Sequence, residues 1–150
     1  MSITEKPDPS GKGLIMVIIT PKQEEYLKMY AHKGVIIDDT YNITPYQLNL
    51  TTLLVVDDND RGRTAAFLIS NATSSNEIDY LFQQVKLVDN SFCPEILMSD
   101  EAGCFWKSYC NIFPENLNMT KRLMCRWHIQ RAWKKNVNSY IDVTNPTIND

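Results

Sequence analysis

The chain has 150 residues, of which 43% are hydrophobic and 22% charged, which is the length and composition of one globular domain. The main apolar run near the N-terminus, Leu14 to Ile19, is far shorter than the ~20 residues needed to cross a bilayer. The sequence therefore predicts no signal peptide, no transmembrane segment and no membrane partner. In the reducing compartment that this implies, the four cysteines are expected to remain thiols or to bind metal.

The net charge of −3 is unevenly distributed along the chain. Residues 1–120 contain 9 Lys or Arg against 16 Asp or Glu, whereas residues 121–135 contain six basic residues and no acid. Overall acidity argues against a protein that coats nucleic acid through bulk charge, but one basic helix can still contact phosphates. The residues expected to do so are Arg126, Arg131, Lys134 and Lys135, with a solvated helix face as the alternative.

Residues 1–13 are polar and rich in Pro and Gly, so we expect a flexible lead-in, with folding starting at a strand from Leu14 to Ile19. Thr20, followed by Pro21 and Gln23, predicts the start of a helix that runs to about His32. The β-branched run from Gly34 to Ile37 predicts a strand covered on both faces, and this strand ends in Asp38 and Asp39.

Two β-rich runs, Leu48–Val56 and Arg63–Ser70, flank a turn-forming cluster of Asp, Asn and Gly and predict an antiparallel hairpin. The capping sequence that starts at Ser74 precedes apolar residues at helical spacing and predicts an amphipathic helix. A short apolar strand then ends at Asp100, and a second amphipathic helix runs from Ala102 to Phe113.

The last predicted elements are a strand over 121–127 and a helix over 128–137, followed by a polar tail at 138–150. We expect Trp106, Trp127 and Trp133 to pack in the core rather than to act as base-stacking platforms, and Ile129 and Ala132 to lie with Trp133 on the buried face of the last helix. Three leading strands followed by alternating helices and strands describe a mixed α/β sheet with helices packed on it.

Two apolar strands, Val35–Ile37 and Ile96–Met98, are each followed by an acid, at Asp38 and at Asp100. If the strands are neighbours, the two carboxylates converge at one edge of the sheet and favour Mg²⁺ or Mn²⁺. Asp39 cannot share that site with Asp38, because successive side chains on a strand point to opposite faces. The alternatives are a solvated strand end for Asp38 and a helix cap for Asp100.

Cys125 and His128 are spaced as zinc ligands can be, but a closed structural zinc site needs four ligands and this motif supplies two. Cys93, Cys104, Cys110 and His32 could complete it only through folding. The alternative for Cys125 is a small buried hydrophobe in a strand.

Five motifs in order resemble the MULE (Mutator-like element) transposase domain, and most closely the transposon-derived animal proteins that carry a SWIM zinc finger. The motifs span about Leu14 to Val137, and they are Ile37-Asp38-Asp39-Thr40-Tyr41, Leu50–Asp57, Ala66–Asn71, Met98-Ser99-Asp100-Glu101-Ala102 and Cys125–Trp133. The resemblance implies a ribonuclease H-like fold, a DDE catalytic set, transposon-end DNA as substrate and a nuclear location. Asp38 matches the first catalytic acid and Asp100 the second, whereas Asp39 stands where the family has a small residue.

The resemblance also implies that the third acid, a Glu, follows a helical insertion beyond Val137, so we expect a C-terminally truncated, partial domain that is inactive alone. Glu115 and Asp142 are unconvincing substitutes for it. Three hypotheses remain open: a partial transposase, a domesticated remnant that binds DNA or protein without catalysis, and a different nuclease complete within the chain. Whether the protein forms a homo-oligomer also stays open.

Overall fold

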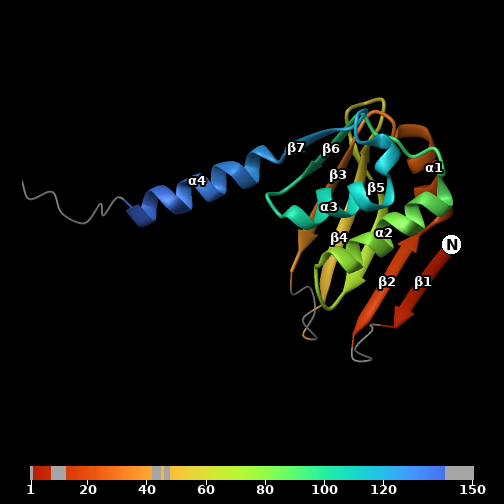
Figure 1. Cartoon of the computed structure of the whole chain (residues 1–150), viewed down its shortest axis with the longest axis horizontal. Helices are drawn as coiled ribbons and strands as arrows, with labels where there is room; N and C mark the ends of the chain where they lie inside the picture. Colours follow the sequence, from red (N-terminus) through yellow and green to blue (C-terminus); the bar gives the residue numbers. More distant parts are fainter. Residues whose placement is uncertain (1, 8–12, 42–44, 46–47, 141–150) are drawn as a thin grey trace, which may run out of the picture.

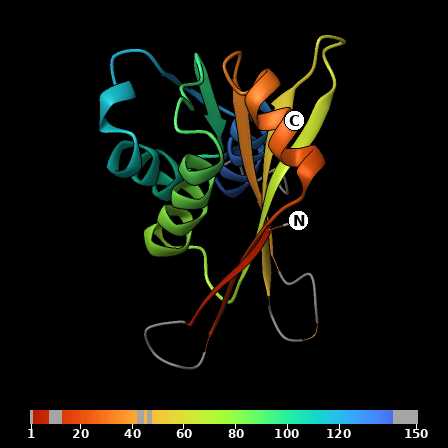
Figure 2. The same cartoon turned by 90° about the vertical axis from the view of Figure 1, so that its right-hand side faces the viewer.

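A seven-stranded mixed sheet with helices on both faces forms the body of the protein (Figures 1 and 2). The structure is a computed structural model, and it describes residues 2–7, 13–41, 45 and 48–140. The strands are β1 (Ser2–Pro7), β2 (Leu14–Ile19), β3 (Val35–Thr40), β4 (Asn49–Val56), β5 (Gly62–Ser70), β6 (Ile96–Ser99) and β7 (Lys121–Met124). The helices are α1 (Pro21–Tyr30), α2 (Ser75–Val88), α3 (Gly103–Ile112) and α4 (Arg126–Tyr140), with a 3-10 turn η1 (Pro114–Asn116).

The strands lie in the order β1-β2-β5-β4-β3-β6-β7. The first three predicted strands of the core, β3, β4 and β5, are antiparallel, whereas β6 runs parallel to β3 and β7 parallel to β6. The chain between β6 and β7 passes through α3, whereas the chain between β3 and β6 contains β4, β5 and α2. This topology confirms the predicted mixed α/β sheet. It also places β3 and β6, the two strands that are followed by the predicted site acids, side by side.

The expectation that regular structure begins near Leu14 is wrong, because β1 pairs antiparallel with β2 along its whole length, from Ser2 opposite Ile19 to Pro7 opposite Leu14. Its sequence is polar because β1 is an edge strand, which needs no apolar residues on two faces. Pro7 is tolerated at its end, where a missing N–H breaks no central ladder. Residues 8–12 and the predicted tail beyond Tyr140 lie outside the described residues.

Helix α1 covers one face of the sheet, and α2 and α3 cover the other (Figure 2). Both predicted capping boxes are present, at Thr20 for α1 and at Ser74 for α2. Between α2 and α3 lies an aromatic cluster in which Phe82 meets Tyr109 and Phe113 edge-on, with ring centroids 5.8 and 6.0 Å apart. These rings are fully buried and hold the two helices against the sheet.

The hairpin between β4 and β5 is closed by Asp57. One carboxylate oxygen accepts hydrogen bonds from the backbone N–H groups of Asn59 and Arg61, and the other accepts one from Arg63 Nε at 2.7 Å. These interactions, led by the Arg61 backbone bond, lower the pKa of Asp57 from 3.8 to about 2. Asp60, in the same turn, has a φ of 58°, a conformation that Asp and Asn tolerate better than most residues.

We predict that Asp57→Asn lowers the melting temperature at neutral pH, because the amide loses the ionic bond to Arg63 and weakens both backbone bonds. Because folding lowers the pKa of Asp57 below its ordinary value of 3.8, the ionised carboxylate stabilises the fold fully above pH 3.8. This contribution is lost as the pH falls through about 2. The difference from the unmodified protein should therefore be largest at pH 7 and shrink between pH 4 and pH 2 in thermal unfolding. Asp60→Asn, which changes another acid of the same turn, is the control, and a pH-independent difference for Asp57→Asn would contradict the prediction.

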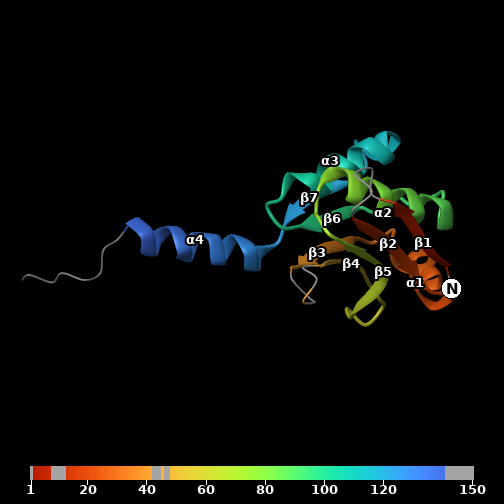
Figure 3. The ribbon, with the colours of Figure 1, turned by 90° about the horizontal axis from the view of Figure 1, so that it is seen from below.

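Helix α4 leaves the body at the end of β7 and extends away from it (Figures 1 and 3). The prediction that Trp127 and Trp133 pack in the core is wrong, because 57% of Trp127 and 71% of Trp133 are exposed. Ile129 is exposed as well, and only Trp106, which stacks on Tyr109 with ring centroids 5.7 Å apart, packs against the core as expected. In the part of the chain that the structure describes, no helix is both long and apolar enough to span a bilayer.

Candidate functional site

A hollow of about 690 Å³ lies where β3 and β6 end and α4 begins. Asp38 and Asp100, the two acids predicted to form a site, both line it. Arg131 and Lys135, two of the four predicted DNA-contacting residues, line it too. The structure thus brings acids from two neighbouring parallel strands and bases from one helix to the same cavity.

The position of the acids follows from the parallel register, in which Ile36 pairs with Met98. Two residues further along each chain come Asp38 and Asp100. Because side chains alternate along a strand, Asp38 points to the same face of β3 as Ile36. The alternative that Asp100 caps α3 is wrong: the N-cap is Ala102, which has no side-chain cap bond, although Asp100 Oδ1 accepts the Ala102 N–H at 2.8 Å.

His128, from the first turn of α4, lies across the hollow from Asp38, with Nε2 3.8 Å from the Asp38 Oδ1. Its other ring nitrogen, Nδ1, is buried and has no hydrogen-bond partner among the described residues. Together with Trp127, Arg131 and Lys135, it forms one side of α4 at the spacing of successive helical turns. The sequence indicated His128 only as a possible zinc ligand and gave no sign that it would lie close to Asp38.

Asp39 is buried beside the site, and neither of its carboxylate oxygens makes a hydrogen bond to any part of the chain that the structure describes. Burial raises its pKa above 3.8, the neighbouring Thr51 and Thr73 hydroxyls oppose this rise, and the charges of Asp100 and Asp38 add to it. Asp39 shares its face of β3 with the buried residues Val35 and Ile37, as alternation along the strand predicts, yet it lines the same hollow as Asp38, so the two acids are not kept apart as expected.

The same negative field reaches two further groups. Burial, Asp39 and Asp100 together raise the pKa of Tyr41 and of the Cys104 thiol. The hollow is lined by four acidic residues and by the two basic residues Arg131 and Lys135, and this excess of carboxylates suits it to binding a cation.

The residues present suit a hard divalent cation, because carboxylate oxygens are the donors that Mg²⁺ and Mn²⁺ prefer and Asp39 adds two unpartnered oxygens beside them. The described residues include no group of three or more Asp, Glu, His or Cys side chains positioned to hold a metal. All four cysteines, at 93, 104, 110 and 125, are free thiols.

The remaining predicted residues lie apart from this hollow. Glu115 forms an ion pair with Lys86 at 3.0 Å, on the far side of α3, which rules it out as a third acid of the site. Asp142 lies outside the described residues. Lys134 lines a smaller neighbouring hollow, and Arg126 is exposed. Glu101, which the sequence placed in the motif of Asp100 without a role in the site, lines the main hollow next to Asp100.

The chain matches no protein-family model, and no curated protein is similar to it at a significant level.

Proposed function

We propose that this chain carries a ribonuclease H-like domain of the Mutator-like transposase kind, which binds Mg²⁺ or Mn²⁺ through Asp38 and Asp100 for phosphoryl transfer on DNA in the nucleus. One observation carries the proposal: these two acids, from the ends of adjacent parallel strands, line one cavity that a basic helix faces. The antiparallel order β5-β4-β3, continued by the parallel strands β6 and β7, supports the fold that the resemblance implies.

Each side chain of the cavity has a separate task in this proposal. Asp38 and Asp100 hold the cation, which when bound activates the attacking oxygen and stabilises the departing one. Arg131 and Lys135 bind the phosphates that flank the reacting one, because guanidinium and ammonium groups are the usual phosphate partners. His128, close to Asp38, orients that carboxylate or contacts the DNA backbone.

Negative charge on both the protein and the DNA explains why a cation is needed. Asp38, Asp39, Asp100 and Glu101 all line the cavity, and without a cation they would repel a phosphodiester. The basic residues lie on α4, on the opposite wall. This separation of charge suits a substrate whose backbone runs along α4 while one phosphate reaches the acids.

Metal binding is the first activity to test, because the resemblance leaves the third acid unassigned. In a Mn²⁺ titration of the ¹⁵N-labelled protein, we expect paramagnetic broadening centred on the amides near Asp38 and Asp100, and competition by Mg²⁺. Calorimetry on the same samples gives the affinity. Broadening that is absent, or centred elsewhere, would overturn the catalytic-domain proposal and favour a domesticated remnant without metal chemistry.

A further inference from the structure

Trp127 is held at the mouth of the acid cavity although more than half of it is exposed. It lines both the main hollow and a second one of about 220 Å³, whose other walls are Gln130, Arg131 and Lys134. The Arg131 guanidinium lies over its ring, 5.2 Å from the centroid, and the His128 ring meets it edge-on at 4.8 Å. The indole is therefore oriented by two neighbours without being covered by the core.

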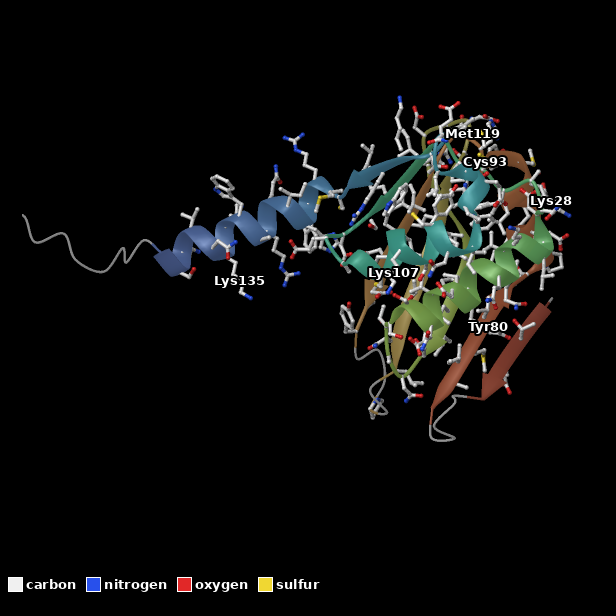
Figure 4. The ribbon with its side chains drawn as sticks, viewed as in Figure 1. Lys28, Tyr80, Cys93, Lys107, Met119 and Lys135 are labelled. Atoms are coloured by element: carbon white, nitrogen blue, oxygen red, sulfur yellow. The ribbon has the colours of Figure 1, made fainter. Side chains whose placement is uncertain are left out.

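The surroundings of Trp127 are basic, since α4 contains no acidic residue and carries Arg126, Arg131, Lys134 and Lys135. An exposed aromatic ring flanked by such residues is the combination that single-stranded nucleic-acid sites use: the ring stacks on a base and the cations track the backbone. Figure 4 shows α4 and its side chains, Lys135 among them, standing clear of the other helices, so a strand can approach along it.

We propose that Trp127 and Arg131 form a stacking site for an unpaired nucleotide of the DNA strand that enters the acid cavity; this inference rests on the proposed function. The nucleotide must be unpaired, because bases inside a duplex are stacked on each other and present no free face to a side chain. Because Trp127 and Arg131 line both hollows, a base stacked there lies beside the cavity that contains Asp38 and Asp100. The site thus recognises a frayed or extruded end rather than continuous duplex.

Trp133 provides a matched control on the same helix. It is more exposed than Trp127, but it lines neither hollow. Both tryptophans extend from α4 into solvent, so neither substitution removes core packing. A general effect of losing an exposed indole or of disturbing α4 would therefore appear in both variants, whereas a stacking site predicts an effect at Trp127 alone.

The test measures binding of a dye-labelled oligo(dT) single strand, and of a duplex, by fluorescence anisotropy at fixed salt in EDTA. We expect Trp127→Ala to weaken single-strand affinity roughly 5- to 150-fold, the range for loss of one base–aromatic stack. Trp127→Phe should restore most of the affinity, and Trp133→Ala should leave it within about twofold, because it breaks no stack. Duplex affinity should be the same for Trp127→Ala and the unmodified protein.

Equal losses for Trp127→Ala and Trp133→Ala, an equal loss on duplex DNA, or no single-strand binding by the unmodified protein would overturn the stacking site. The assay contains no free divalent metal, so its outcome is separate from that of the Mn²⁺ titration. Localised Mn²⁺ broadening with no effect of Trp127→Ala would remove only the stacking site. A Trp127-dependent single-strand affinity with no Mn²⁺ binding would support the stacking site while removing the catalytic function.

Discussion

Replacing either Asp38 or Asp100 with Asn will weaken Mn²⁺ binding at least ~10-fold, since even outer-shell changes at metal sites cost about 10–100-fold in affinity. Each substitution removes half of the carboxylate charge that the proposed site supplies from its two strands, and the amide that remains is a weaker, neutral donor. Calorimetry gives the affinity, and loss of paramagnetic broadening near the substituted residue checks the location. The double variant should show no localised broadening.

Asp60→Asn is the control for these two variants. It also removes one negative charge, but Asp60 lies in the β4–β5 turn beside Asp57, and its positive φ is a conformation that Asn accepts readily. Its Mn²⁺ affinity should equal that of the unmodified protein. An equal drop for Asp60→Asn would mean that Mn²⁺ responds to overall charge and not to a site at the ends of β3 and β6.

Replacing Phe82 with Ala will lower the free energy of unfolding by roughly 3–5 kcal/mol, the usual range for removing a buried phenyl ring. Phe82 is fully buried and contacts Tyr109 and Phe113, so its loss leaves a cavity between α2 and α3. Urea unfolding should show a lower midpoint with an unchanged slope.

Leu87→Ala is the matched control, because Leu87 lies on the same helix but is 79% exposed. Its effect should stay within about 0.5 kcal/mol, as is usual for surface substitutions. If Phe82→Ala and Leu87→Ala had similar effects, the aromatic cluster would not be the contact that fastens α2 and α3 to the sheet.

The order of elements from Val35 onward could be predicted because each has a local signal. The strands show either alternation of apolar and polar residues or a continuous run of β-branched residues. Both capping boxes mark the start of a helix within one residue. The strand β1 could not be predicted in this way. Its polar residues are compatible with a loop, and only its pairing with β2, a contact between separate segments, makes it a strand.

The candidate site was predictable in part. An acid at the end of each of two apolar strands indicated where Asp38 and Asp100 would lie, since sheet topology brings strand ends together. The exposure of Trp127 and Trp133 was not predictable, because helical periodicity identifies an apolar face but not whether a partner covers it. The spacing of Trp127, Arg131 and Lys135, four residues apart, indicated that they share one side of α4, but only the structure shows that this side faces the acids.

The buried carboxylate of Asp39 gives the fold an unusual response to mild acid. An acid whose pKa is raised on folding destabilises the native state when it is ionised. Protonation removes this electrostatic cost as the pH falls towards 3.8. The stabilising contribution of Asp57, whose pKa is lowered to about 2, is lost only below that pH range. Acidification from neutral pH therefore first relieves the cost of the Asp39 charge and only later removes the contribution of Asp57, so these two groups change stability in opposite directions.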